Sequence, residues 1–381
     1  MAHLCTPDEC GTCIKINFDE AIMKQQIIDF LLANADPSTV LRVKKEVLGF
    51  LSSAEEADLL EKIIPQKIVQ LIIQSQKPDG WFGGAFHGNY VGGKYYDNME
   101  VGLRYLVEKG FPYDNEYISK AVKCLLLKEP FDAAYRVKEP KAPNTDYSLT
   151  SIGLYLYRSS IILRAGYEYL VPKDHFINLE YDVNFSLSNF TNVLDYEKSE
   201  DAIETHRKKV CFKQGVLWPC MYHLRMLAHS QSWRNEQNKA LLIKSVNRLS
   251  TFSQSGVDVY TYRRGQFISP CWPFIFTNIT ADDSITNEVV GTSWFDIMEL
   301  YARCGIINYI PVVKNEYDTM LSLIDEDLKL NFKCCTKKNS FYWGPYSGIA
   351  LETDWRSALK VQCDILFRIL LIMHYTNQGD Y

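Results

Sequence analysis

Apolar residues recur at three- and four-residue spacing along much of this chain, as they do on one face of an α-helix. Ile27, Ile28 and Leu31 show this pattern near the start of the sequence. Asp36 followed by Pro37 predicts the start of a further helix, because proline suits the first helical position and aspartate suits the N-cap before it. Alternation typical of strands is short and sparse. The pattern therefore predicts an all-α protein.

The helical pattern also repeats along the chain. A polar or aromatic cluster precedes a helix that is apolar on one side, and the helix ends near a glycine or a charged turn. These clusters occupy residues 95–97, 144–146, 215–218, 291–294 and 352–355. Their spacing of roughly 50 to 75 residues accommodates a helix pair and a loop each time. We expect Gly110, Gly166 and Gly305 to mark three of the helix ends.

One motif closes the apolar run at residues 68–73, with Gln76, Gly80 and Trp81 in a polar turn broken by proline and glycine. We expect Gln76 and Trp81 to tie one helix pair to the next. Over residues 36–125 the chain resembles bacterial proteins with prenyltransferase/squalene-cyclase repeats, a group related to squalene/hopene cyclases and protein prenyltransferase β subunits. The resemblance implies an α/α toroid, in which inner and outer helices alternate around a central cavity.

The resemblance and the pattern assign residues 21–381 to a single α/α-toroid domain and residues 1–20 to a cysteine-containing N-terminal extension. The net charge of −5, with acidic and basic residues interspersed, argues against a nucleic-acid partner. We expect no membrane span, because the most apolar stretch, residues 358–375, carries a charged stripe of Lys360, Asp364 and Arg368. With no export signal in view, we expect a cytoplasmic protein with reduced cysteines.

The resemblance also implies where a site would lie. In a toroid the N-termini of the inner helices converge on one end, where their dipoles favour anions. Aromatic residues expected to line a cavity there are Trp81, Tyr96, Trp218, Trp294 and Trp355. Residues expected to carry catalysis there are Asp97, His223, Asp354 and His87. His87 lies in a glycine-rich loop and is a candidate general base, whereas each carboxylate taken alone also suits a helix N-cap.

The chain departs from the acid and metal motifs of these families. The Asp-x-Asp-Asp acid of the cyclases has no counterpart, since the acidic clusters at residues 282–283 and 325–327 have other spacings. The zinc ligands of protein prenyltransferases are an aspartate, a cysteine and a histidine. Asp296, Cys304 and His374 are candidates, although a helix start and a buried thiol explain the first two more simply.

The N-terminal extension contains the densest set of metal-ligand types in the chain. The set is His3, Cys5, Cys10 and Cys13. It matches the ligand types of a Cys3His zinc site. Its Cys-x4-Cys-x2-Cys spacing also matches part of an iron–sulfur loop, whose fourth ligand would be distant, such as Cys124 or Cys334. A flexible terminus with reduced thiols is the simplest interpretation.

Three functions follow from these observations. The first is binding or conversion of a hydrophobic substrate, such as an isoprenoid or peptide-linked molecule, in an aromatic central cavity. The second is a non-catalytic helical-repeat protein that binds a peptide or a partner protein. The third is a zinc-dependent enzyme of the prenyltransferase type. A centre filled by side chains favours the second.

Overall fold

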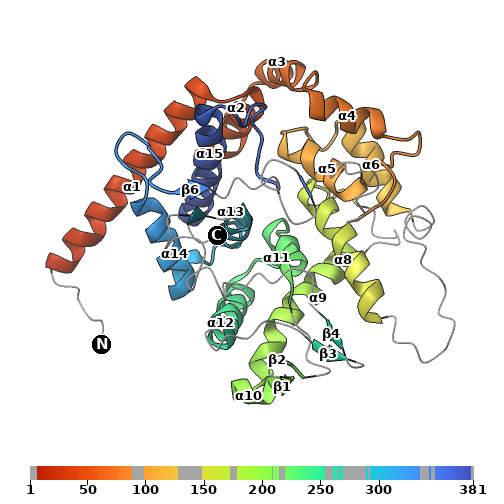
Figure 1. Ribbon diagram of the computed structural model, residues 1–381, viewed down its shortest axis with the longest axis vertical. Helices are drawn as coiled ribbons and strands as arrows, with labels where there is room; N and C mark the ends of the chain where they lie inside the picture. The colour runs from red at the N-terminus through yellow and green to blue at the C-terminus, as the bar shows by residue number, and fades with distance from the viewer. Residues whose placement is uncertain are drawn as a thin grey trace.

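The computed structural model describes residues 7–87, 98–127, 148–171, 178–207, 209–213, 219–253, 261–263, 266–268, 289–290, 292–334, 343–344 and 348–378. The described part is mostly helical, as the apolar periodicity predicts (Figure 1). Its strands are short. They form a four-stranded sheet of β1 (Ile203–His206), β2 (Lys209–Phe212), β3 (Thr261–Arg263) and β4 (Gln266–Ile268), and a two-stranded sheet of β5 (Val289–Val290) and β6 (Lys333–Cys334).

Six helical segments, here called the central helices, follow one another in contact. They are α2 (Pro37–Arg42) with its continuation η1 (Val43–Val47), α5 (Met99–Glu108), α8 (Ser148–Arg164), α11 (Met221–Ala228), α13 (Thr292–Arg303) and α15 (Ala358–Asn377). From α5 to α15 each central helix packs against the next, and α15 packs against α2 and η1. An ion pair between Arg42 and Glu108 then connects α2 to α5.

Other helices lie beside the central ones. They are α1 (Pro7–Asn34), α3 (Ser53–Ile63), α4 (Lys67–Ser75), α6 (Glu116–Leu126), α9 (Leu179–Thr191), α10 (Ser199–Ala202), α12 (Glu236–Ser253) and α14 (Pro311–Ser322), with the short 3-10 turns η3 (Asn192–Asp195) and η5 (Ile307–Tyr309). In Figure 1, α1, α3, α6 and α14 lie toward the periphery, while α11 and α13 lie near the middle. One apolar core extends through these elements.

The central helices α13 and α15 run in the same direction. Arg368 of α15 pairs with Glu299 of α13. Further toward the ends of both helices, the ring of Tyr375 of α15 lies under the guanidinium of Arg303 of α13. Residues further along α15 therefore contact residues further along α13, so the two helices are parallel. The connections that leave the ends of the central helices are short, at residues 109–115, 165–178, 229–235 and 304–310. From α5 onward, the segments that precede the central helices span more residues, at 76–98, 127–147, 192–220, 254–291 and 323–357, whereas only residues 35–36 separate α1 from α2.

Three central helices end in the same backbone arrangement. Gly110, Gly166 and Gly305 have positive φ angles of 93°, 85° and 69°. Each glycine N–H and the N–H that follows it bond back to carbonyls of the last helical turn, as in a Schellman motif. Glycine is favoured here because a Cβ atom disfavours the left-handed backbone region. The three helix ends predicted from the sequence are confirmed.

The turn after α4 joins two helix pairs, as the sequence predicts. The Nε2 atom of Gln76 donates to the carbonyl of Tyr117 on α6 at 2.8 Å and to the carbonyl of Gly80 at 3.1 Å. Trp81 is buried against Phe86. Gly80 has a φ of 98°, and a Cβ atom there would lie 2.3 Å from the carbonyl oxygen of Lys120. The turn therefore fixes α4 against α6 through side-chain and backbone contacts.

The first two helices differ in part from expectation. Helix α1 runs unbroken from Pro7, so the boundary expected at residue 20 falls inside a helix. Asp36 and Pro37 do occupy the N-cap and first position of α2, but the Asp36 carboxylate does not cap that helix. It accepts hydrogen bonds from the N–H and hydroxyl of Thr353 and from Lys360. Asp36 therefore ties the start of α2 to the start of α15.

The charged stripe of α15 points inward. Lys360 is partly exposed, whereas Asp364 and Arg368 are 0% and 3% exposed. Asp364 accepts hydrogen bonds from the N–H groups of Leu351 and Glu352. Among the described residues, no helix combines the length and apolarity needed to cross a membrane.

Candidate functional site

Several residues expected at the site can be placed and others cannot. His3, Cys5, Tyr96, Asp97 and Trp218 lie outside the described residues. Cys10 and Cys13 lie in α1, but their side chains are not described. The residues that can be placed are His87, His223, Asp354, Trp81, Trp294 and Trp355.

Two of the tryptophans and Asp354 make structural contacts. The indole N–H of Trp294 donates to Glu316 of α14 at 3.1 Å, and that of Trp355 donates to Asp364 at 2.5 Å. Asp354 accepts a hydrogen bond from the N–H of Arg356, two residues further on. These contacts secure the starts of α13 and α15.

His223 caps the start of α11. Its Nδ1 atom accepts a hydrogen bond from the N–H of Cys220 at 2.9 Å, and its Nε2 atom is buried with no partner among the described residues. Burial lowers the pKa of His223 to about 4, against the opposing effect of the Cys220 contact. The imidazole is therefore neutral at pH 7. This arrangement suits a helix cap better than a proton carrier.

His87 belongs to an oriented acid–base cluster. Its Nδ1 atom lies 2.5 Å from one carboxylate oxygen of Glu100 at the start of α5. The hydroxyl of Tyr222 on α11 donates to the other oxygen at 2.6 Å. The His87 ring packs on Tyr157 of α8 with ring centres 4.6 Å apart, and Tyr157 packs in turn on Tyr222. Three central helices thus position one histidine.

The charge of Glu100 is stabilised where it lies. Burial by itself raises the pKa of Glu100, but the hydrogen bonds from His87 and Tyr222 and the charge of Arg225 outweigh it, so that the pKa is lowered. The carboxylate fixes the imidazole and offsets the positive charge that it acquires on protonation. His87 is also the accessible member, with 18% of its side chain exposed against 3% for Glu100. The cluster can exchange a proton with a ligand that reaches His87.

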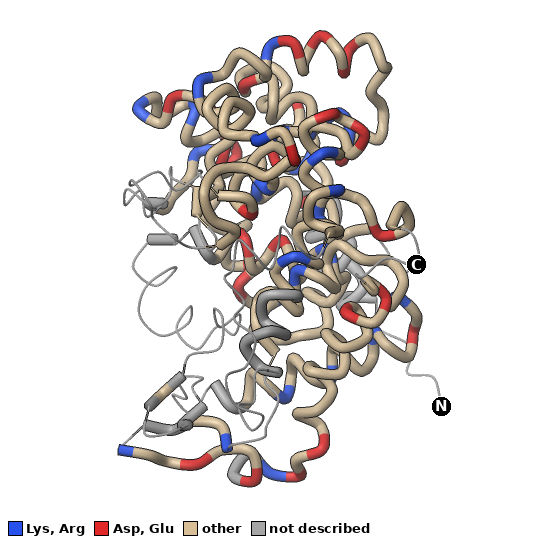
Figure 2. The backbone as a smooth tube through the Cα atoms, turned by 90° about the vertical axis from the view of Figure 1, so that its right-hand side faces the viewer, with Lys and Arg blue, Asp and Glu red and all other residues tan. Residues whose placement is uncertain are grey.

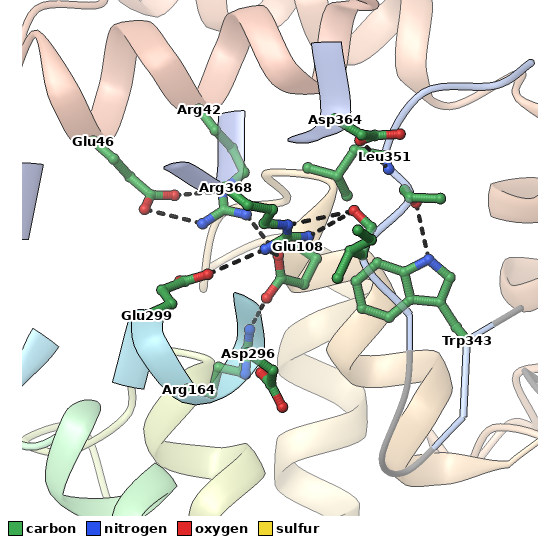
Figure 3. Close-up of polar contacts among 12 residues, drawn as sticks. Arg42, Glu46, Glu108, Arg164, Asp296, Glu299, Trp343, Leu351, Asp364 and Arg368 are labelled. Atoms are coloured by element: carbon green, nitrogen blue, oxygen red, sulfur yellow. Dashed lines mark hydrogen bonds and ion pairs between the residues drawn. The ribbon is translucent and has the colours of Figure 1, made fainter. Parts of the chain in front are cut away.

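Arginine and carboxylate side chains from several central helices point toward one another (Figure 3). Arg225 of α11 pairs with Asp296 of α13 at 2.8 Å. Glu108, at the end of α5, forms ion pairs with Arg42 at 2.6 Å and with Arg368 at 2.9 Å. It also pairs with Arg164 of α8. All of these except Asp296 have side chains less than a tenth exposed. Glu108 therefore connects three other central helices to α5.

A second carboxylate pair continues the network toward the ends of the helices. Glu299 pairs with Arg303 at 2.8 Å and Arg368 at 3.3 Å, and Glu46 pairs with Arg303 at 3.2 Å. Burial opposes ionisation of Glu46, yet the charges of Arg42 and Arg303 hold its pKa well below its usual range. Acidic and basic positions are interspersed along the backbone, in the middle of the view as well as on its outer turns (Figure 2).

These ion pairs leave little empty space at the centre. A void among Arg104, Glu108, Arg164, Asp296 and Arg368 has a volume of about 10 Å³, which is at the lower limit for holding one water molecule. The space among these five residues is therefore filled by side chains.

A larger cavity of about 330 Å³ lies at the ends of α8, α11, α13 and α15. Basic side chains predominate among its charged lining residues, which are Arg164, Arg234, Glu236, Lys239 and Arg303, and His229 also lines it. Burial and the charges of nearby arginines hold the pKa of His229 well below its usual range. The cavity suits an anionic group, but no carboxylate contacts its histidine as Glu100 contacts His87 among the described residues.

The zinc ligands considered from the sequence are engaged elsewhere. Asp296 pairs with Arg225, Cys304 is buried at the end of α13, and His374 contacts Lys24 and Gln378. Within the described ranges, the only group of three or more His, Cys, Asp and Glu residues whose ligand atoms lie within 4.8 Å of one another is Glu204, His206 and Cys211. The transferase-type set is therefore not assembled.

Comparisons with protein-family models, curated proteins and solved structures found no match to this chain. The site is therefore interpreted from its own geometry. The residues that sequence analysis missed are Glu100, Tyr222 and the buried arginines. A signal for some of them exists, because Glu100, Arg104 and Glu108 follow at four-residue spacing in a helix that is otherwise apolar.

Proposed function

We propose that the central helices form the inner layer of an α/α toroid and that the remaining helices form its outer layer. Three observations support this arrangement. From α5 to α15, and on to α2, each central helix contacts the next. The ion pair between Arg42 and Glu108 connects α2 back to α5, and α13 and α15 run parallel. Helices α6, α9, α12 and α14 each follow a central helix after a short connection, as alternation of inner and outer layers requires.

We further propose that the protein is an acid–base catalyst with His87 as its proton carrier. The contact of 2.5 Å between His87 and Glu100 is the observation that carries this proposal. With the Nδ1 proton directed at the carboxylate, the Nε2 atom of neutral His87 is the proton acceptor. Tyr222 holds the second oxygen of Glu100, so the carboxylate is fixed from both sides. The reaction class is transfer of a proton to or from a bound substrate.

The substrate binds at the starts of the central helices, where His87 is accessible, and not between them. The substrate class is a hydrophobic molecule, an isoprenoid or a peptide-linked compound among them, because the buried rings of Phe86 and Tyr157 beside His87 give this end of the molecule an apolar environment. The ion pairs around Glu108 exclude such a molecule from the centre, because it would leave those charges buried without partners.

The proposal is tested by screening isoprenoid and peptide compounds for conversion by mass spectrometry, with wild-type protein and the variants His87→Gln, Glu100→Gln and Tyr222→Phe. Loss of a general acid–base typically lowers the rate by about 10² to 10⁴-fold, so His87→Gln should show a loss of this order. Glu100→Gln should show a smaller loss, and Tyr222→Phe the smallest. Glu116→Gln, at an exposed ion pair of α6, is the matched control.

A structural measurement accompanies the screen. Nitrogen-15 NMR of labelled histidine should show the Nδ1–H tautomer for neutral His87 in the wild-type protein and a mixture in Glu100→Gln. Conversion that survives His87→Gln at the wild-type rate would eliminate His87 as the proton carrier. A change of tautomer with no change of rate would assign Glu100 a purely structural role.

A second function, a non-catalytic protein that binds a peptide or partner protein, is favoured by the filled centre. Affinity capture with wild-type protein and His87→Gln separates the two functions. Equal capture of a partner by both proteins, with no compound converted, would favour the binding protein.

A further inference from the structure

A hairpin far from the His87 cluster brings three metal-ligand types together. Glu204 and His206 are two residues apart in β1, so their side chains point to the same face of the strand. Cys211 of β2 lies directly opposite Glu204 in the antiparallel register, and directly opposed residues share a face. Strand geometry alone therefore places a carboxylate, an imidazole and a thiol on one side of the hairpin.

The distances fit a small coordination sphere. The Nε2 atom of His206 lies 3.1 Å from a carboxylate oxygen of Glu204, and the ligand atoms of all three residues lie within 4.8 Å of one another. In a tetrahedral zinc site, nitrogen and oxygen ligands are about 3.3 Å apart and a sulfur ligand is about 3.5 Å from either, given the usual bond lengths. Small side-chain rotations therefore suffice to bind an ion.

From this geometry we propose that Glu204, His206 and Cys211 bind one Zn²⁺ ion, with water as the fourth ligand. The ligand types favour zinc over magnesium or calcium, since a thiolate and an imidazole are poor ligands for those harder cations. The Glu204 carboxylate and the Cys211 thiolate together neutralise the charge of the ion. Both Glu204 and His206 have side chains 34% exposed, so the ion and its water reach the site from solvent.

Binding changes two contacts within the hairpin. The Nε2 atom of His206, which lies 3.1 Å from the Glu204 carboxylate, binds the ion through its lone pair, so the neutral ring then carries its proton on Nδ1. The Cys211 thiol donates a hydrogen bond to the Glu204 carbonyl at 3.5 Å. When zinc binds, this proton leaves to solvent and the sulfur lone pair forms the zinc bond instead. The ion then connects β1 to β2 through side chains as well as through the backbone ladder.

Cobalt titration of the chelator-treated full-length protein tests the site, because a thiolate bound to tetrahedral Co²⁺ absorbs characteristically. The N-terminal set His3, Cys5, Cys10 and Cys13 is a competing source of thiolate ligands. The titration therefore starts from a variant in which those three cysteines are serine. We expect this variant to bind one Co²⁺ per chain and to release it to Zn²⁺.

Three further substitutions on this background are Cys211→Ser, His206→Ala and Glu204→Gln. Each should weaken metal binding by more than about 100-fold, since loss even of an outer contact to a ligand costs about 10- to 100-fold. Circular dichroism verifies that each variant is folded. If Cys211→Ser does not fold, the variants at the partly exposed residues Glu204 and His206 still test the site. Absence of the cobalt–thiolate absorption in the background variant, or unchanged binding in His206→Ala and Glu204→Gln, would overturn the proposal.

Discussion

Substitution of Glu108 by glutamine should destabilise the protein strongly. Glu108 is 2% exposed and is the shared partner of Arg42, Arg164 and Arg368, which come from three different helices. Glutamine keeps the size of the side chain and removes its charge. The amide also replaces one acceptor oxygen by a donor, which faces guanidinium groups that are donors themselves. The three arginines then lose their common counter-charge in a buried site.

The magnitude follows from the burial of the partners. Removing one partner of a buried ion pair typically costs about 3 to 5 kcal/mol, because the remaining charge is left uncompensated. Glu299 and Glu46 still neutralise part of the charge on Arg368 and Arg42, so we expect about 4 kcal/mol rather than a multiple of it. At about 2.1 cal/mol/K per residue, the 381 residues give an unfolding entropy of about 0.8 kcal/mol/K. The melting temperature should fall by about 5 °C.

Differential scanning calorimetry and urea unfolding at pH 7 measure this effect. Glu116→Gln is the control, because its pair with Lys120 is more than half exposed and contributes less than about 1 kcal/mol. The double variant Glu108→Gln with Arg368→Met should recover part of the loss, since it removes one of the unpaired charges. A melting temperature within 1 °C of wild type for Glu108→Gln would refute the argument that the central charges depend on one another.

Two further predictions concern local structure and pH. Gly80→Ala should destabilise the protein by a few kcal/mol, because Gly80 has a positive φ and the new Cβ atom would lie 2.3 Å from the Lys120 carbonyl oxygen. Gly84→Ala is the control and should change little, because a Cβ atom there meets no atom within 4 Å. Thermal unfolding of both variants measures the difference. His223 has a folded pKa of about 4, below its unfolded value, so its contribution to stability is complete above about pH 6.5 and is lost as the pH falls. Urea unfolding at pH 7.5 and 5.5 should show a smaller acid loss for His223→Gln, by about 1 kcal/mol, and equal losses would contradict the shift.

Local features of the fold were predictable because neighbouring residues determine them. Gly110, Gly166 and Gly305 end their helices through hydrogen bonds within one turn, and Pro37 begins α2 for a similarly local reason. Asp36 shows the limit of such reasoning. Its N-cap position follows from the sequence, but its carboxylate binds Thr353, a partner 317 residues away.

The candidate site was less predictable for the same reason. His87 stands out in a glycine-rich loop, but its partner Glu100 resembles any carboxylate in a first helical turn. The charged stripe of α15 argued against a membrane span, but the sequence did not show which way the stripe faces. Its residue Arg368 points into the interior, where it pairs with Glu108, a residue 260 positions earlier in the sequence. Four-residue spacing of charges is equally compatible with a solvated face and a buried one, so only the packing of the helices decides between them.

The unequal connections between helices bear on how this protein could be re-engineered. Three of the short connections begin with a glycine cap that fixes the chain within a few residues, so an insertion there would disturb the direction of the following helix. A grafted peptide or a new pair of chain termini should therefore avoid Gly110, Gly166 and Gly305, whose caps set the direction of the helices that follow.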